Sequence, residues 1–480
     1  MKQETEQVGS DSNILDEATL LNKQVPIWPD ALYDDISGML ASSQVKVVVL
    51  DDDPTGTQTV HGVTVLTTWD VDAIAQEFST LDNAFYILTN TRSMPTAQAE
   101  ALNQEIAQNI SVAASRIQQK YTIVSRGDST LRGHYPEEVT TLIEGLGGNF
   151  DGTLLIPYFH EGGRLTVNDI HYVKQDGKLI PVAQTEFARD AVFGFSQSNM
   201  KKWVEEKTNG IVKAESVVTL SLELIRTGGP EAVAEKLEQL TNNCTCVVNA
   251  AHQRDVEVVA LGALFAEKKG KRLFYRSSSS FVQARAGISS RPLLTANDLQ
   301  SDGAGGTLVI VGSYVPKTTS QLNELLNQCD IQPVVLEVEK LLDAKSAGDM
   351  ISQAALSIDE QIRQGKDAVL YTSRKLVTSK DDENNLAIGQ KVSQSLISTL
   401  HAMKSIPRYI IAKGGITSSD VATIGLNIQR AHVKGQVSPG VPVWQCGPES
   451  RFPGLNYVVF PGNVGQPETL AQVVTMLSEG

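Results

Sequence analysis

The sequence is poor in cysteine and in aromatic residues. Of its 480 residues, 6% are aromatic and four are cysteine, at Cys244, Cys246, Cys329 and Cys446. The cysteines lack the paired spacing of a zinc site, and Cys244 and Cys246 are too close in sequence for an ordinary disulfide. This scarcity excludes a disulfide scaffold and fits best with a protein that works in a reducing cytoplasm.

The sequence also lacks an excess of positive charge and any long apolar run. Its formal net charge of −14 repels nucleic acid and anionic membranes, so an anionic ligand would need a local cluster of arginine or lysine. No segment approaches the roughly 20 apolar residues of a membrane span. The polar start of the chain, residues 1–16, has no apolar signal region. We therefore expect a soluble cytoplasmic protein that binds neither nucleic acid nor membrane; a homodimer is compatible with the sequence.

What the chain does contain is an alternation of strand and helix patterns. Hydrophobic residues make up 41%, and the length exceeds what one hydrophobic core normally serves. Strands alternating with helices predict mostly parallel sheets with right-handed crossovers. The expected fold class is α/β, with two domains that each have a mostly parallel sheet flanked by helices. We expect an N-terminal arm (1–45), a first domain (46–292), a linker (293–306) and a second domain (307–480), with the active site between the domains.

Three consecutive acids, Asp51, Asp52 and Asp53, end the first predicted strand, Lys46–Leu50. Open α/β sheets bind ligands at the carboxyl ends of their strands. Adjacent carboxylates repel one another unless a cation or a donor-rich turn offsets their charge, so the arrangement suggests a use. The simpler alternative is a tight turn at Asp53–Gly56 with a capping acid.

Later strand ends in the first half carry arginines beside a further acid, Asp128. The arginines are Arg92, Arg126, Arg132 and Arg164. The planar fork of arginine suits a carboxylate, so we expect a small organic acid as the ligand. An adjacent carboxylate could accept a proton from a substrate hydroxyl. The alternative is that Arg126 and Arg132 only form structural ion pairs with Asp128 and Glu137.

Glycine-rich turns follow the predicted strands of the second half. The main one is Lys413–Asp420, between the predicted strand Tyr409–Ala412 and a helix, and others lie at Val311–Tyr314, Thr372–Arg374 and Pro461–Gly465. Such turns let backbone N–H groups approach a phosphate, and a following helix N-terminus adds favourable potential. No Walker A motif, GxGxxG motif or protein-kinase signature is present. A nucleotide would therefore be bound by a different cradle.

These motifs, in this order, resemble the four-carbon acid sugar kinase family. They are Asp52-Asp53-Pro54-Thr55-Gly56, Arg126-Gly127-Asp128-Ser129-Thr130-Leu131-Arg132-Gly133, Gly163-Arg164, Val311-Gly312-Ser313, Gly414-Gly415-Ile416-Thr417 and Gly462-Asn463-Val464-Gly465. The resemblance covers nearly the whole chain after about Lys46. It implies a sugar-acid-binding N-terminal domain, a nucleotide-binding C-terminal domain, and phosphorylation of threonate, erythronate or 3-oxo-tetronate by ATP with Mg²⁺.

The resemblance also implies roles for individual residues. Asp52 and Asp53 match the catalytic acidic pair, and no metal ligand is assigned. The implied substrate-binding residues are Asp52, Arg92, Arg126, Gly127, Asp128, Ser129, Arg132 and Arg164, and the implied nucleotide-binding residues are Ser313, Gly414, Gly415, Ile416, Thr417 and Gly462. The sequence departs from the family at Pro54, at Thr57–Gly62, at Arg126 and at Ile416, which leaves the substrate less defined than the reaction.

Two other functions compete with a kinase. The run from Leu50 to Thr55 also matches the DxDxT strand end of haloacid-dehalogenase-type phosphatases, with Asp51 as nucleophile and Asp53 as acid/base, although the downstream lysine and acidic pair are not found. A sugar-acid-binding protein without catalysis is the non-enzyme alternative. For a kinase we favour Asp53 as the base, because it is nearest the Pro54–Gly56 turn, and we expect Asp51 to be tied to backbone donors.

Overall fold

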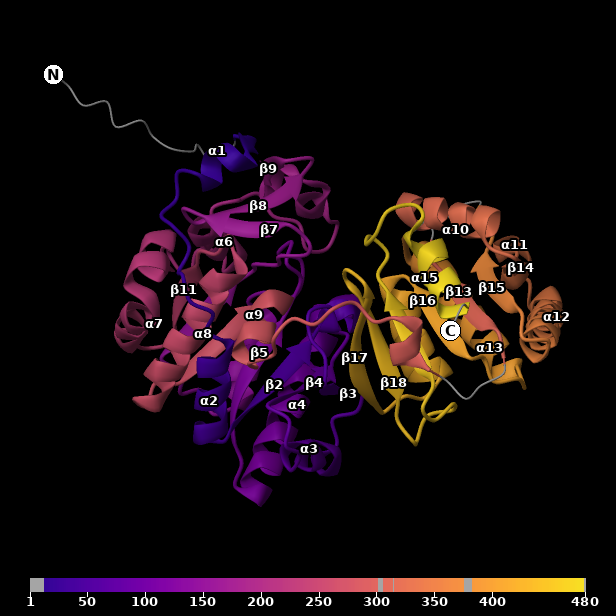
Figure 1. Cartoon of the computed structure of the whole chain (residues 1–480), viewed down its shortest axis with the longest axis horizontal. Coiled ribbons are helices and arrows are strands. Elements are labelled where there is room, and N and C mark those ends of the chain that lie inside the picture. Colours follow the sequence, from indigo (N-terminus) through magenta and orange to yellow (C-terminus); the bar gives the residue numbers. More distant parts are fainter. Residues whose placement is uncertain (1–12, 301–304, 314, 375–381, 479–480) are drawn as a thin grey trace. The chain divides into compact units, whose positions relative to one another are not determined.

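The computed structural model describes residues 13–300, 305–313, 315–374 and 382–478, with the backbone alone at 344 and 382–387 (Figure 1). The chain divides into two compact units. The N-terminal unit contains the chain up to Gly56 and Trp69–Ser290, and the C-terminal unit contains Thr57–Thr68 and the chain from Arg291 onward. Part of the expected linker, 301–304, lies outside the described residues.

A parallel sheet forms the centre of the N-terminal unit, with strand order β10-β11-β6-β12-β5-β2-β4. The bounds are β2 Val45–Asp51, β4 Ala84–Leu88, β5 Lys120–Arg126, β6 Gly152–Ile156, β10 Val218–Leu220, β11 Cys244–Val248 and β12 Leu273–Ser277. Val47, Val48 and Val49 of β2 are fully buried, as expected for a strand covered on both faces. The chain leaves β2 for β4 on one side and returns to β5 on the other, so β2 ends at a topological switch point.

The helices of this unit pack in two groups. One contains α3 Val71–Phe78, α4 Thr96–Ile117 and α5 Glu137–Gly145, and the other contains α2 Tyr33–Ser43, α7 Leu222–Glu238, α8 Gln253–Lys268 and α9 Ser279–Arg285. Crossovers that run in opposite directions along the sheet require helices on opposite faces. Two further helices are α1 Glu17–Leu21 and α6 Met200–Lys207.

The segment expected to be an arm is folded where the structure describes it. In α2, Ile36 is fully buried and Leu40 nearly so, and α2 packs against α8. The backbone N–H of Leu32, which precedes α2, donates to Glu257 Oε2 at 3.2 Å. Ile36 and Leu40 are four residues apart, which is a helical spacing, but Asp34 and Asp35 make the segment polar on average, so its sequence does not stand out as a helix. Residues 1–12 of the expected arm lie outside the described residues.

A small antiparallel sheet, β1-β9-β8-β7, also belongs to this unit. Its strands are β1 Leu15–Asp16, β7 Arg164–Val167, β8 Ile170–Gln175 and β9 Lys178–Pro181.

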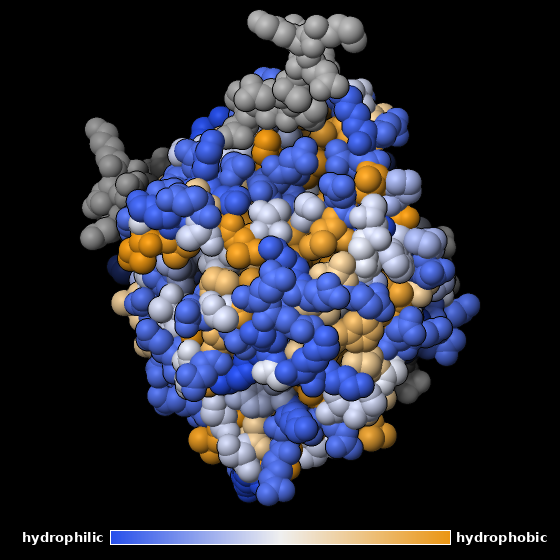
Figure 2. Space-filling view, turned by 90° about the vertical axis from the view of Figure 1, so that its left-hand side faces the viewer, coloured by the Kyte–Doolittle hydropathy of each residue, from blue (hydrophilic) through white to orange (hydrophobic). Residues whose placement is uncertain are grey.

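On the face drawn in Figure 2, hydrophobic side chains lie scattered among hydrophilic ones. Such scattered apolar residues are normal on a surface that faces water.

The C-terminal unit contains a mixed sheet of order β3-β17-β18-β19-β16-β13-β15-β14. The strands β19, β16, β13, β15 and β14 are parallel, and β3, β17 and β18 are antiparallel to their neighbours within the unit. The bounds are β3 Val63–Leu66, β13 Thr307–Val311, β14 Ile331–Leu336, β15 Asp367–Thr372, β16 Tyr409–Lys413, β17 Arg430–Ser438, β18 Val441–Cys446 and β19 Asn456–Phe460.

The segment Thr57–Thr68 packs with the C-terminal unit, although the sequence analysis includes it in the first domain. Its strand β3 pairs with β17, with Val63 opposite Val433. Trp444, which is fully buried, donates from Nε1 to Thr57 Oγ1 at 3.0 Å. No local pattern indicates a partner this far along the chain.

The helices of the C-terminal unit are α10 Pro316–Gln328, α11 Val338–Leu342, α12 Ala344–Arg363, α13 Asp382–Ala402, α14 Gly415–Asp420 and α15 Thr469–Ser478. The sequence predicts one helix over Ser418–Gln429. Instead, α14 begins three residues earlier and passes into a π-helical turn, Val421–Gly425, before β17 begins at Arg430. Among the residues with described positions, no helix is both long and apolar enough to span a membrane.

Candidate functional site

The three acids that end β2 differ in how far they are buried. Asp51 and Asp52 are 2% exposed, whereas the side chain of Asp53 is 20% exposed. A short 3₁₀ turn, Pro54–Thr57, follows, and Thr55 N donates to Asp53 Oδ1 at 2.8 Å. A Cβ atom at Gly56 would overlap the carboxylate of Asp51, so this turn can close over Asp51 only with glycine.

Two of the predicted arginines neutralise these acids. Arg92, in the 3₁₀ turn after β4, donates from Nε to Asp52 Oδ2 at 3.1 Å and lies 3.3 Å from Asp53 Oδ2. Arg126, the last residue of β5, lies 3.1 Å from Asp51 Oδ1 and 3.7 Å from Asp52 Oδ1. Asp51 is therefore paired mainly with Arg126, in addition to a backbone contact from Asp53 N at 3.4 Å. The carboxyl ends of parallel neighbours bring all five side chains together.

The structural ion pair considered for Arg132 is present. Arg132 Nε lies 2.6 Å from Asp128 Oδ2, and Thr130 N donates to Asp128 Oδ1 at 3.2 Å. Arg126, in contrast, pairs with Asp51 and not with Asp128. Asp128 thus organises its own loop, from Gly127 to Arg132, in which Ser129 is also buried.

Arg276 is a site residue that the sequence analysis missed. It lies on β12, beside β5, and its Nη1 donates to Ser125 Oγ at 2.7 Å and lies 3.0 Å from Glu138 Oε2. Its Nη2 lies 3.9 Å from Asp52 Oδ2. A Cβ atom at Gly127 would overlap this guanidinium, which explains a glycine there. The apolar run Leu273–Tyr275 predicts a strand that stops just before Arg276, whereas β12 continues to Ser277.

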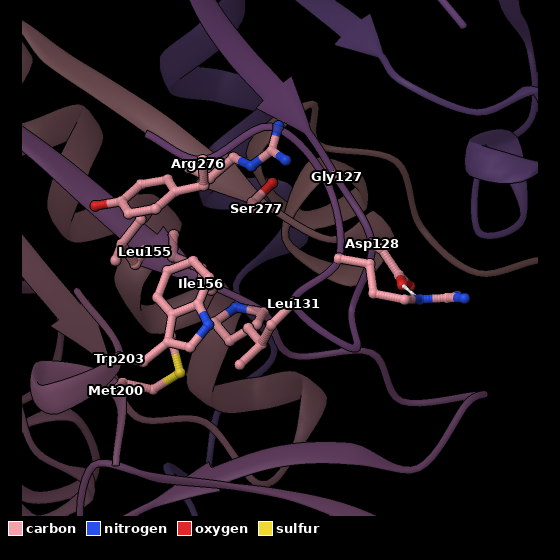
Figure 3. Close-up of a pocket in the computed structure, with 12 residues that line it drawn as sticks. Gly127, Asp128, Leu131, Leu155, Ile156, Met200, Trp203, Arg276 and Ser277 are labelled. Carbon is pink, nitrogen blue, oxygen red and sulfur yellow. Dashed lines mark hydrogen bonds and ion pairs between the residues drawn. The ribbon is translucent and has the colours of Figure 1, made fainter. Parts of the chain in front are cut away.

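A small cavity of about 30 Å³ opens beside the loop, with room for roughly one water molecule. Figure 3 shows Asp128, Arg276 and Ser277 around it together with apolar side chains. The apolar part comes from Leu131, Leu155, Ile156, Met200 and Trp203. Asp128, Arg132 and Arg276 therefore lie next to an apolar wall, whose low local dielectric strengthens charge interactions.

Arg164, at the start of β7, is a half-buried cation that has no acid within ion-pair distance among the described residues. Its guanidinium bonds to Gly162 O and lies 5.7 Å from the centre of the Phe187 ring, which Arg132 also contacts at 5.1 Å. In the part of the chain that the structure describes, no carboxylate lies within ion-pair distance of Arg164, and its buried Nε has no hydrogen-bond partner. Burial lowers the pKa of Arg164, which the nearby charge of Asp128 only partly offsets. The guanidinium of Arg164 is therefore available to bind an anion.

The surroundings of Asp51 and Asp53 shift the pKa values of these two carboxyl groups in opposite directions. Burial raises the pKa of Asp51 to about 7 despite the attraction of Arg126. Burial also acts on Asp53, but the charges of Arg92 and Arg126 and hydrogen bonds from Thr55 outweigh it, so the pKa of Asp53 is lowered. Asp53 is therefore ionised at neutral pH and is the most accessible of the three acids.

His171, on β8, holds the loop that contains Ser129. Its Nε2 lies 2.8 Å from Ser129 O and its Nδ1 lies 2.9 Å from Thr166 Oγ1. Burial lowers the pKa of His171 to about 4, so the ring is neutral at pH 7. Because Ser129 O can only accept, Nε2 carries the proton and Nδ1 accepts from Thr166.

The predicted phosphate-binding turns gather at one edge of the other sheet. Ser313, Gly414 and Gly462 follow β13, β16 and β19, which are parallel neighbours. A Cβ atom at Gly414 would lie 2.9 Å from Ser313 Cβ, and one at Gly462 would meet nothing closer than Gly414 Cα at 4.0 Å. Gly414 has φ 117°, a conformation that favours glycine. The backbone can therefore approach a ligand closely here.

The remaining predicted nucleotide residues lie on the first turn of α14. Gly415 begins the helix, Ile416 is 66% exposed, and Thr417 is buried. A Cβ atom at Gly312 would overlap Thr417 Oγ1, so Gly312 permits this close packing. Tyr314 lies outside the described residues. Within the described chain, no group of three or more His, Cys, Asp or Glu side chains could hold a metal ion.

Two family models match most of the chain. Residues 47–285 match the model described as a sugar-binding N-terminal domain, and residues 308–470 match the model described as a nucleotide-binding C-terminal domain. No curated protein matches this chain.

Two solved structures share its fold. Protein HI1011 from Haemophilus influenzae, of the family DUF1537, is 17% identical with a TM-score of 0.60, and the match covers 90% of this chain and 100% of that chain. A protein described as a putative tRNA synthase from Salmonella typhimurium LT2 is 17% identical with a TM-score of 0.61, covering 89% of this chain and 98% of that chain. At this identity the likeness shows the fold alone.

Proposed function

We propose that this protein, which belongs to the family with a sugar-binding N-terminal domain and a nucleotide-binding C-terminal domain, is an ATP-dependent kinase that phosphorylates a small sugar acid. The substrate would be a compound of about four carbons, such as threonate, erythronate or 3-oxo-tetronate. In this proposal the N-terminal unit binds the sugar acid and the C-terminal unit binds ATP.

The observation that carries the proposal is Arg164. Arg164 is half-buried, its Nε is buried without a hydrogen-bond partner, and a ligand carboxylate would supply both the missing acceptor and the missing opposite charge. Arg132 shares the Phe187 ring with Arg164 and could contact the same carboxylate. Arg92, Arg126, Asp128 and Ser129 then remain for hydroxyl groups and for holding the acids in place.

Asp53 is the acid best suited to the accepting hydroxyl. It is ionised and partly exposed, and Arg92 fixes its orientation at 3.3 Å. Phosphoryl transfer depends mainly on positioning and electrostatics, and a carboxylate that accepts the hydroxyl proton assists it. Asp52, which is buried and bonded to Arg92, would orient the arginine.

The position of Asp51 argues against the phosphatase alternative. A nucleophilic carboxylate must reach its substrate, but Asp51 is 2% exposed, pairs with Arg126 and lies under Gly56. A binding protein without catalysis would need the arginines but not an accessible, ionised Asp53.

The glycine edge of the C-terminal unit fits nucleotide phosphates. Gly462 faces open space beside Gly414, and Gly414 in turn lies beside Ser313. We propose that ATP binds at Ser313, Gly414, Gly415, Ile416, Thr417 and Gly462. Mg²⁺ would arrive coordinated by the phosphates, as is usual for this ion, and we assign it no protein ligand. We also expect the enzyme to work in the cytoplasm, and a homodimer stays a prediction.

The test is a screen of C3 to C6 sugar acids, each with ATP and Mg²⁺, for release of ADP. The expected result is turnover with at least one four-carbon acid and none with the corresponding neutral sugars, because these lack the carboxylate. Isothermal titration without nucleotide distinguishes the alternatives. Sugar acids that bind but never cause ADP release would support the non-catalytic alternative, and hydrolysis of a sugar phosphate without ATP would support a phosphatase.

A further inference from the structure

Lys413, the last residue of β16, is fully buried, which is rare for lysine unless an acid pairs with it. Its Nζ donates to Pro461 O and lies 3.3 Å from Gly462 O. The same Nζ lies 4.2 Å from the centre of the Phe460 ring. All three contacts belong to the end of β19 and the glycine turn that follows it.

No acid neutralises this lysine within the described residues: no carboxylate there lies within ion-pair distance of Lys413. The charged group that faces it is another cation, Lys317 of α10, whose Nζ lies 3.4 Å from Gly465 O. Asp420 of α14 bonds instead to Ser393, and Arg374, after β15, bonds to Ser313 O. Burial, together with Lys317, lowers the pKa of Lys413 to about 7.

The turn that Lys413 holds is the one that leaves room for a ligand. Gly462 O also lies 3.4 Å from Thr318 Oγ1, so its carbonyl contacts both Lys413 and α10. The α-carbon of Gly462 faces open space beside Gly414. An anion bound there would lie beside the turn whose carbonyls the buried amine of Lys413 contacts, and attraction between opposite charges in a partly dry site favours the charged form of that amine.

We propose that Lys413 is a positioning residue of the nucleotide site, which holds the Pro461–Gly462 turn for the phosphates and takes up one proton when they bind. The inference rests on the proposed function, because it takes the ligand of this edge to be a nucleotide. The proton comes from the solvent and converts the neutral amine to ammonium, and no other bond is made or broken. Phosphate binding and protonation of Lys413 then stabilise each other.

The experiment is isothermal titration of the full-length protein with MgADP between pH 7.5 and 9, in buffers with different enthalpies of ionisation. In this range the phosphates of the ligand are already ionised, so any protons taken up on binding are bound by groups of the protein. We expect close to one proton taken up per nucleotide at pH 8.5, and an affinity that falls by up to about tenfold per pH unit.

Variants assign the proton to Lys413. Lys413→Met keeps the length of the side chain but cannot be protonated, so proton uptake should disappear and the pH dependence of affinity should flatten. Lys366→Met, at an exposed lysine before β15, is the control and should keep the uptake. The wild-type measurement stands even if Lys413→Met does not fold.

The outcomes separate the two proposals. Nucleotide binding without proton uptake overturns the role of Lys413 but leaves the kinase intact if sugar acids still cause ADP release. Proton uptake without any phosphorylated sugar acid overturns the kinase alone. Absence of binding by ADP and ATP overturns both.

Discussion

The carboxylate of Asp51 lies where a side chain at Gly56 would have to begin. Gly56 is thus fixed by an acid five residues earlier, and that acid is fixed in turn by Arg126. We expect Gly56→Ala to destabilise the protein by about 1–3 kcal/mol, because either the turn or the Asp51–Arg126 pair must shift. Urea unfolding measures this, and Gly38→Ala is the control, since nothing lies within 4 Å of Gly38 on the exposed side of α2. Equal stability of the two variants would contradict the overlap.

Arg164→Met should weaken sugar-acid binding by about 2–4 kcal/mol, roughly 30- to 1000-fold, while the affinity for ATP stays unchanged. The reason is the loss of the half-buried cation assigned to the substrate carboxylate, whereas the apolar stem beside Phe187 is retained. Titration calorimetry with each ligand measures both affinities. Arg189→Met, at an exposed arginine, is the matched control. A parallel loss of ATP affinity would point to general disruption and not to a carboxylate site.

Asp53→Asn should lower kcat by about 10²- to 10⁴-fold with little change in sugar-acid affinity, because the amide cannot accept the hydroxyl proton. Asp51→Asn should act mainly on stability, since it leaves Arg126 without its closest buried partner. Steady-state kinetics and thermal unfolding of both variants give the comparison. Mass spectrometry adds a further check, because an aspartyl-phosphate on Asp51 would support the phosphatase alternative.

Gly462→Val should fold normally and lose nucleotide binding. An added Cβ meets only Gly414 Cα, at 4.0 Å, so the branched side chain would occupy the space proposed for the phosphates. Gly348→Val, at an exposed position of α12 with nothing within 4 Å, is the control for the substitution itself. Fluorescence titration with a labelled ATP analogue measures affinity. Retained binding by folded Gly462→Val protein would remove this turn from the site.

His171 should make the protein less stable as the pH falls from about 6.5 to 4. Its pKa is about 4 when folded, below its ordinary 6.5, so the unfolded chain binds more protons in this window. The effect is at most about 3 kcal/mol, fully present as stability above pH 6.5 and lost toward pH 4. Asp51, whose pKa is raised to about 7, acts in the opposite direction.

The measurement is therefore the difference between wild type and His171→Gln in unfolding free energy across pH 4.5 to 7.5. Glutamine can still donate to Ser129 O but does not titrate. The two pH profiles should converge as the pH falls. Parallel profiles would show that His171 does not titrate in this window.

Much of the fold could be predicted because the strands are buried on both faces. The run Ala84–Leu88 is predicted with its observed bounds, since a continuous apolar run ends abruptly in polar residues. Parallel pairing then brings the ends of β2, β4 and β5 together, which is why Asp52, Arg92 and Arg126 meet. The three side chains are close together because the strands that precede them are parallel neighbours in the sheet.

What could not be predicted depends on partners distant in sequence. Whether Arg126 pairs with Asp51 or with Asp128 is decided by the register of β2 against β5, since Asp51 lies opposite Arg126. The strands β17 and β18 are not predicted because Gly435 occupies one of the buried positions of the alternating β17, and Pro442 interrupts the short apolar run of β18. The π-helical turn after α14 has no counterpart in simple periodicity.

The placement of β3 has a consequence for how the protein can be made or divided. The chain passes between the units after Gly56, after Thr68 and after Ser290, so a cut near residue 291 leaves β3 in the first fragment and its partner β17 in the second. The second fragment alone would expose an open edge of β17, which invites aggregation. During synthesis, β3 leaves the ribosome more than 360 residues before the segment it pairs with. Its pairing with β17 can therefore form only after almost the whole chain has been translated, which makes this contact slow to form during folding.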